Sequence, residues 1–100
     1  MSTKKQKNKE AARTSVTVAF TAHGWDDYEY WKAADADTLE KIDTLIRDCL
    51  RSPYKGLGKP EPLVGSLSGF WSRRITGEHR LVYLFEGGTL TIIQCRYHYG

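Results

Sequence analysis

A carboxylate, several basic residues and a histidine in the second half of the chain could together cleave RNA without a metal ion. In that chemistry a base takes the proton from the ribose 2′-hydroxyl, which attacks the adjacent phosphorus, and an acid protonates the departing 5′-oxygen. Cations stabilise the phosphate as it gains negative charge. RNA can react in this way and DNA cannot, because only RNA carries the 2′-hydroxyl. The residues concerned are Lys59, Glu61, Arg73, Arg74, Arg80, His98 and Tyr99.

The same residues also have purely structural interpretations. Glu61 lies between two prolines and is compatible with an exposed turn, and His98 is compatible with a frayed chain end. The arginines are compatible with an exposed strand edge. Spacing alone therefore leaves the RNA-cleaving site as a hypothesis.

Other kinds of site find less support. The three histidines, His23, His79 and His98, show no metal-ligand spacing. Gly56 and Gly58 precede no predicted helix and are a weak match to a phosphate-binding loop. We therefore expect a protein that works without a metal or another cofactor.

Length and charge indicate one small domain with two electrostatic sides. The chain has 100 residues, a net charge of +3 and 40% hydrophobic residues, as in an ordinary globular domain. Residues 22–48 contain eight acidic and three basic residues, and residues 49–100 contain seven basic and three acidic ones. The basic half is a candidate surface for RNA or DNA, with ordinary surface charge as the alternative.

The first residues differ in composition from the rest. Residues 1–14 contain five basic residues, one acidic residue and no apolar periodicity, which predicts a disordered basic tail before a single domain at residues 15–100. No segment approaches the about 20 apolar residues of a membrane span or resembles a secretory signal. Cys49 and Cys95 lack metal-ligand or CxxC spacing and are interpreted as reduced thiols. We therefore expect a cytoplasmic protein without membrane partners.

The pattern of apolar residues predicts an α+β domain. Alternating apolar and polar residues indicate strands, and apolar residues three or four positions apart indicate helices. Short glycine-containing turns join the last three strands into an antiparallel meander, so we expect two helices packed on one antiparallel sheet. The expected elements are a strand at residues 15–21, helices at residues 25–34 and 37–50, and strands at residues 70–76, 79–85 and 89–97.

Turn and cap residues delimit these elements. Gly24 is expected to end the first strand, and Pro53 to end the second helix. Asp37 and Glu40 have the spacing of a capping box at the start of that helix. The Gly- and Pro-rich residues 54–69 follow as a long loop, a kind of segment that often carries function in a small domain.

The hairpin turns decide which side chains share a face of the sheet. A two-residue turn at residues 87–88 places Arg80 and His98 on opposite faces. A three-residue turn, or a bulge in the last strand, places them on the same face, which the active-site hypothesis favours. A two-residue turn in the preceding hairpin puts Arg73 on that face as well.

Five short segments are distinctive enough to compare with known families. They read WDDYEYW at residues 25–31, GLGKPEPL at 56–63, LSGFWSRRIT at 67–76, EHRLVY at 78–83 and CRYHY at 95–99. Together they resemble YoeB-type toxins of the RelE superfamily, and the resemblance covers residues 16–99. The third and fourth segments form a block too long and too unusual in composition for a chance match.

The resemblance implies a fold and an activity. YoeB-type toxins have a compact fold related to microbial ribonucleases, enter the ribosome and cleave messenger RNA in the A site without a metal. By this resemblance Glu61 is the general base and His98 the general acid. Arg80 then stabilises the phosphate and Tyr99 shapes the site. The basic residues expected to bind RNA phosphates are Lys59, Arg73 and Arg74.

The resemblance also implies partners. A YefM-like antitoxin is expected to wrap the toxin and to block or distort its site. The pair is expected to repress its own operon, so the toxin reaches operator DNA only through the antitoxin complex. Ribosomes and messenger RNA are the other expected partners, and homodimer formation is left open.

Two residues depart from the family pattern. Val64 stands where a lysine often follows Glu-Pro-Leu, and Gly100 follows the tyrosine at which the family tends to end. Two alternative functions remain: a noncatalytic RNA- or DNA-binding module, and an inactive relative that serves antitoxin binding. A base and an acid at Glu61 and His98 favour the enzyme, because a pure binding module needs neither.

Overall fold

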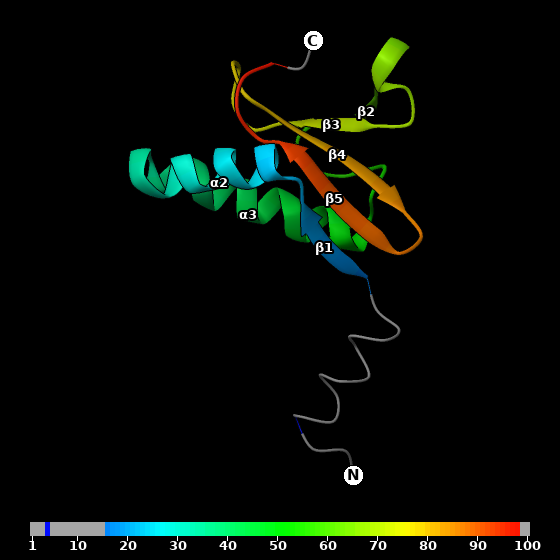
Figure 1. Ribbon diagram of the computed structural model, residues 1–100, viewed down its shortest axis with the longest axis horizontal. Helices are drawn as coiled ribbons and strands as arrows, with labels where there is room; N and C mark the ends of the chain where they lie inside the picture. The colour runs from blue at the N-terminus through cyan, green and yellow to red at the C-terminus, as the bar shows by residue number, and fades with distance from the viewer. Residues whose placement is uncertain (1–3, 5–15, 99–100) are drawn as a thin grey trace.

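The computed structural model describes Lys4 and residues 16–98, in which two helices lie against one five-stranded sheet (Figure 1). The predicted α+β fold is confirmed. The predicted tail, apart from Lys4, and Tyr99 lie outside the described residues. The elements are β1 Thr17–Phe20, α2 Ala22–Ala34, α3 Ala36–Arg51, β2 Glu61–Pro62, a short 3-10 turn at Gly65–Leu67, β3 Trp71–Arg74, β4 Arg80–Glu86 and β5 Thr89–Gln94.

The sheet is mixed, with the strand order β1-β5-β4-β3-β2. β2 to β5 pair antiparallel, which includes the predicted three-strand meander. β1 lies parallel to β5, with Thr17 opposite Thr89 and Phe20 opposite Ile92. The expectation of a wholly antiparallel sheet was therefore wrong at this edge. Parallel pairing between the first and last strands depends on the path of the chain through both helices, which local patterns do not reveal.

α2 begins directly after β1, without the break that Gly24 was expected to make. The Thr21 Oγ1 accepts a hydrogen bond from the Gly24 amide at 3.1 Å and caps the helix. A Cβ on Gly24 would collide with the Ile92 carbonyl oxygen. Glycine at this position therefore lets the first turn of α2 lie directly against β5.

The N-cap of α3 lies two residues before the predicted capping box. The Asp35 carboxylate accepts hydrogen bonds from the amides of Asp37 and Thr38 and from the Thr38 hydroxyl at 2.8 Å. The Thr38 hydroxyl bond is the main reason that the pKa of Asp35 lies below its usual range. The cap is therefore Asp35, and the expectation for Asp37 and Glu40 was wrong.

The core lies between the helices and the sheet. Trp31 of α2 and the apolar residues on one face of α3 pack against β4 and β5. Both cysteines are buried free thiols. Burial raises the pKa of the Cys95 thiol to about 12 and also raises that of Cys49. The buried residues of this core cluster are Trp31, Ile42, Leu45, Ile46, Cys49, Ile75, Leu81, Tyr83, Leu90, Ile92 and Cys95.

The β4–β5 hairpin combines a short turn with a bulge. Glu86 lies opposite Thr89 across a two-residue turn, and Tyr83 lies opposite Ile92. The register then shifts, so that Val82 lies opposite Gln94. The bulge exchanges the faces of all later residues of β5, as the active-site hypothesis requires.

The β3–β4 hairpin has a longer turn than expected. Arg74, not Ile75, lies opposite Arg80, and Arg73 lies opposite Leu81. The turn closes through hydrogen bonds from Ile75 and Thr76 to the His79 carbonyl. This one-residue difference puts Arg74 on the face of Arg80 and turns Arg73 towards the helices.

Candidate active site

The face of the sheet opposite the helices carries a row of register partners from four strands. Glu61 lies opposite Ser72, Ser72 opposite Val82, and Val82 opposite Gln94. Neighbouring strands are about 4.8 Å apart, so roughly 14 Å separates the two ends of this row. Ser72 and Val82 are buried and form its floor. The row therefore has a carboxylate at one end and an amide at the other.

Glu61 reaches this face through a tight turn before it. Gly58 and Lys59 both have positive φ values, of 77° and 50°. The Gly58 carbonyl accepts a hydrogen bond from the Arg74 amide at 2.6 Å, and a Cβ on Gly58 would lie 3.0 Å from the Arg74 carbonyl oxygen. Glycine therefore allows the chain to dock beside β3, after which residues 60–62 run along the edge of the sheet. Proline is tolerated at such an edge because its missing amide hydrogen is not needed there.

Arg80 lies opposite Arg74 and two residues before Val82, so it is on the same face of the sheet as the row. Its side chain is largely buried, and its Nη1 donates to the carbonyls of Thr76, Gly77 and His79 at 2.7–3.2 Å. A guanidinium has two further nitrogens that carry hydrogens. Two arginines opposite each other repel, so the pair is a local positive field that favours a bound anion.

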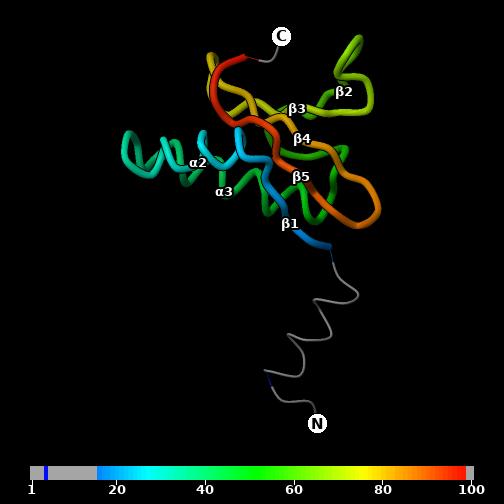
Figure 2. Tube along the Cα trace, viewed as in Figure 1, coloured from blue at the N-terminus to red at the C-terminus, as the bar shows by residue number. Residues whose placement is uncertain are grey.

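The chain after β5 brings His98 to the same face. The Gln94 side chain stands on that face, and its Nε2 donates to the His98 carbonyl at 2.9 Å. The Arg80 amide donates to the Tyr97 carbonyl at 3.1 Å. Figure 2 shows this segment, in red, leaving β5 and passing the β3–β4 turn. Glu61, Arg80 and His98 are therefore carried on one face of the sheet.

Arg73 does not belong to this face, and the expectation that it binds phosphate was wrong. Its side chain is 0% exposed and forms an ion pair with Asp48 at 2.5 Å. The guanidinium also donates to the Tyr83 hydroxyl and to the carbonyls of Ser52, Lys55 and Leu57. Arg73 therefore ties the loop after α3 to the sheet.

The pKa values of the groups around Arg73 are shifted in the directions that favour a structural ion pair. A hydrogen bond from the Leu57 amide, followed by the bond from Arg73, holds the pKa of Asp48 below its usual range. Burial raises the pKa of Tyr83 to about 12. Asp48 thus remains charged and Tyr83 neutral at physiological pH, which is the state that Arg73 needs.

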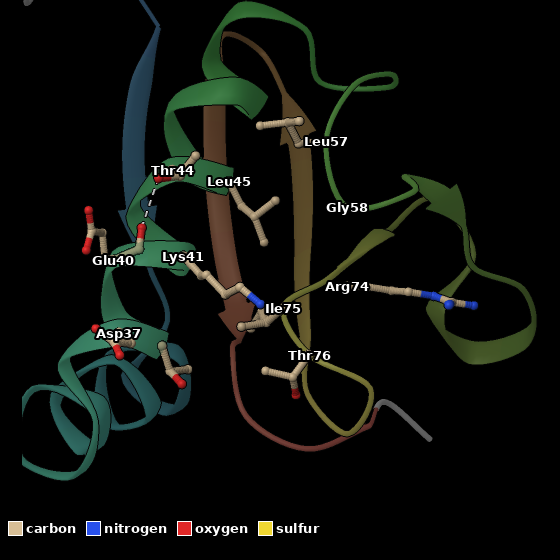
Figure 3. Close-up of a pocket in the computed structure, with 11 residues that line it drawn as sticks. Asp37, Glu40, Lys41, Thr44, Leu45, Leu57, Gly58, Arg74, Ile75 and Thr76 are labelled. Atoms are coloured by element: carbon tan, nitrogen blue, oxygen red, sulfur yellow. Dashed lines mark hydrogen bonds between the residues drawn. The ribbon is translucent and has the colours of Figure 1, made fainter.

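Arg74 and Lys59 are exposed and available to a phosphate, unlike Arg73. Figure 3 shows Arg74 extending away from a groove between α3 and β3, while Lys41 extends from α3 towards Ile75. The groove has a volume of about 650 Å³. Because it lies on the helix side of the sheet, it is separate from the row that contains Glu61.

The role of two residues that hold residues 96–98 was not predicted from the sequence. His79 was considered only as a metal ligand, yet its Nδ1 accepts a hydrogen bond from the Tyr97 amide at 2.7 Å. Gln94 was expected only to share the face of Arg80 and had no predicted role, although its side chain contacts three carbonyls. The only available signal was their position: one precedes Arg80, and the other lies four residues before His98.

Neither a cluster of metal-ligating side chains nor a membrane-spanning helix occurs among the described residues. Among Lys4 and residues 16–98, no three His, Cys, Asp or Glu side chains are arranged to hold a metal ion. No helix in these residues has both the length and the apolar character needed to cross a membrane.

Comparison with known proteins gives one family. Residues 20–99 match the family described as "YoeB-like toxin of bacterial type II toxin-antitoxin system". The toxin YoeB of Streptomyces coelicolor is 54% identical over 84 residues, which are 84% of this chain and 100% of that protein. The toxin YoeB of Escherichia coli K12 is 55% identical over the same shares.

Solved structures agree with the sequence matches. The YoeB/ParE toxin from Agrobacterium tumefaciens is 53% identical and has a TM-score of 0.83, with 84% of this chain and 100% of that chain covered. A YoeB dimer from Staphylococcus aureus is 37% identical with a TM-score of 0.79, and a YoeB–YefM complex from the same organism is 36% identical with a TM-score of 0.78. Both cover 86% of this chain and 100% of the other.

Proposed function

The chain belongs to the YoeB-like toxins of bacterial type II toxin–antitoxin systems, and we propose that it is a ribosome-dependent endoribonuclease that cleaves messenger RNA in the A site. The observation that carries this proposal is the shared face of Glu61, Arg80 and His98. The strand register puts Glu61 and Arg80 on one face, and the bulge in β5 turns Gln94, whose side chain binds the His98 carbonyl, to that face as well. A binding module has no need of a base and an acid there.

The proposed reaction needs only groups from the chain and the RNA itself. Glu61 takes the proton from a ribose 2′-hydroxyl, and the resulting 2′-oxygen attacks the adjacent phosphorus. The bond between phosphorus and the 5′-oxygen breaks, and His98 donates a proton to that oxygen. The products are a 2′,3′-cyclic phosphate and a 5′-hydroxyl. No metal or cofactor takes part in these steps.

The surrounding basic residues have separate proposed roles. Arg80 stabilises the additional charge on the phosphate in the transition state. Arg74 and Lys59, both exposed, bind neighbouring phosphates of the messenger. Tyr99 is proposed to shape the site by its place in the family motif. Val64, which replaces the frequent lysine, is 85% exposed. The surface therefore has an apolar side chain at this position where many relatives have a cation.

A cell-free translation reaction tests the function directly. Purified protein is added to ribosomes that translate a defined messenger, and the new 5′ ends are mapped and their terminal groups identified. We expect cuts within the A-site codon, a cyclic phosphate upstream and a 5′-hydroxyl downstream. Absence of cleavage by the wild-type protein would support one of the noncatalytic alternatives, and a 5′-phosphate product would indicate attack by water.

Replacement of Arg80 by Ala is expected to lower kcat for cleavage by about 100- to 1,000-fold, with a smaller effect on ribosome affinity. The reason is that a charge aimed at the phosphate matters most when that phosphate gains charge in the transition state. Single-turnover cleavage and ribosome co-sedimentation measure the two effects separately.

Arg47→Ala is the matched control for this variant, because it removes an exposed cation from the helix side of the molecule. The control is expected to cleave like the wild-type protein. The assigned role fails if Arg80→Ala loses only ribosome affinity, or if both variants cleave alike.

The family and its structures also support a protein partner. A Staphylococcus aureus relative was solved with YefM, so we propose that a YefM-like antitoxin neutralises this chain and that the pair represses its own operon. Another structure of that relative is a dimer, and we extend self-association to this chain. Since ribosomes are cytoplasmic, we expect the protein to act there.

Antitoxin affinity is expected to fall as salt rises from about 0.05 to about 0.5 M, because the Debye length falls several-fold over that range. An acidic and apolar antitoxin segment should be attracted to the basic half of the toxin, residues 49–100. Calorimetric titration of the co-encoded partner at several salt concentrations measures this effect. Pull-downs from the native host that recover ribosomes but never a small co-encoded protein would contradict the assignment.

A further inference from the structure

The residues after β5 are held by side chains from α2, from the β3–β4 turn and from the end of β5 itself. The Trp31 Nε1 of α2 donates to the Cys95 carbonyl at 2.8 Å, and the Asp27 carboxylate accepts from the Cys95 amide at 3.0 Å. Both bonds are buried and fix the point at which the chain leaves the sheet. The following residues 96–98 have no regular secondary structure of their own. Their conformation therefore depends on contacts with the rest of the molecule.

His79 holds the centre of this segment. Its Nδ1 accepts the Tyr97 amide hydrogen at 2.7 Å, and its ring packs edge-to-face on Trp31 with centroids 4.8 Å apart. The next residue, Arg80, donates its own amide to the Tyr97 carbonyl. Tyr97 has a φ of 63°, an unfavourable value for a residue with a side chain. The backbone amide and carbonyl of Tyr97 are thus held by residues 79 and 80, and these hydrogen bonds compensate for the backbone strain.

Gln94 holds the same segment from the opposite side. Its Nε2 donates to the carbonyls of Arg96 at 2.9 Å, Tyr97 at 3.3 Å and His98 at 2.9 Å. Three carbonyls around one atom assign that atom as the amide nitrogen and not the oxygen. Gln94 occupies this position only because the bulge in β5 turns its side chain to the open face.

We propose that His79 and Gln94 are positioning residues, which hold residues 96–98 in one turn so that His98 is presented to the scissile phosphate. This inference rests on the proposed function. It assigns no proton transfer to His79, whose role is to accept the Tyr97 amide hydrogen. An acceptor at Nδ1 requires the tautomer that carries hydrogen on Nε2, and that nitrogen lies 3.7 Å from the Glu78 carboxylate.

Two substitutions at His79 separate the acceptor from the ring. His79→Phe keeps an aromatic ring against Trp31 but removes the acceptor, whereas His79→Asn keeps an acceptor near the place of Nδ1 and loses the ring. We expect His79→Phe to lower kcat by about 10- to 100-fold with KM within about two-fold of wild type, because small misplacement of a reacting group costs rates of that order. His79→Asn should recover most of the loss. Gln94→Ala, at a half-buried position, should also lower kcat.

Amide hydrogen exchange gives a readout that does not depend on activity. Exchange at the Tyr97 amide should be faster in His79→Phe than in wild type and slow again in His79→Asn. Lys41→Ala is the control, because Lys41 is exposed on α3 on the helix side of the molecule, and it should leave kcat and Tyr97 exchange unchanged.

The outcomes separate this inference from the proposed function. If the wild-type protein does not cleave, the proposed function fails, and unchanged Tyr97 exchange in His79→Phe would refute the positioning role independently. If wild type cleaves and His79→Phe has the same kcat, or if only its KM rises, the inference is overturned. A kcat for His79→Asn that is no higher than that for His79→Phe also overturns the inference, since loss of the ring or of its packing would then explain the effect.

Discussion

Cleavage by Glu61→Gln and by His98→Gln is expected to be about 100- to 10,000-fold slower than by the wild-type protein, because each substitution removes one proton-transfer group. Glutamine resembles both side chains in length and hydrogen-bonds, but it does not take or supply a proton at neutral pH. Mapped messenger ends from translating ribosomes, followed over time at saturating toxin, give the rates.

The two variants should fold like the wild-type protein. Both residues are exposed, and substitutions at such positions usually change stability by about 0.5 kcal/mol or less. Matched controls are Glu86→Gln at the β4–β5 turn and His23→Gln at the start of α2, which should cleave normally. Undiminished cleavage by both Glu61→Gln and His98→Gln would remove the proposed base and acid.

Arg73→Ala is expected to destabilise the fold by about 3–5 kcal/mol, the usual effect of removing one partner of a buried ion pair. The substitution leaves Asp48 and the carbonyls of the loop after α3 without their donor, and it opens a cavity beside Tyr83. For a domain of this size the melting temperature should fall by more than about 10 °C. Thermal unfolding followed by circular dichroism measures this change.

Arg74→Ala is the matched control, since it is the next residue along β3 and is exposed. Its melting temperature should stay close to that of wild type, while its messenger binding weakens. If Arg73→Ala melts like wild type and instead loses RNA binding, the phosphate role expected from the sequence is restored.

The contrast between these two arginines shows what local patterns can and cannot predict. Residue types, apolar periodicity and turn glycines predicted both helices, the meander and the α+β class, because these depend on neighbours within about one turn or one hairpin. The family motifs placed Glu61, Arg80 and His98 in one site before any geometry was known. Neither kind of information separated Arg73 from Arg74, which are adjacent and chemically identical.

What the sequence by itself determined is therefore both helices, four of the five strands, the family and the residues proposed to react, whereas β2, which carries Glu61, lies in the segment expected to be a loop. The tertiary structure decided which side chains share a face, since the longer β3–β4 turn and the bulge in β5 each shift the register by one residue. It also decided that β1 lies beside β5 and that His79 holds Tyr97, contacts between residues more than 15 positions apart. In a strand one residue of shift moves every later side chain to the other face, and the energy that selects the register comes from packing against the whole core.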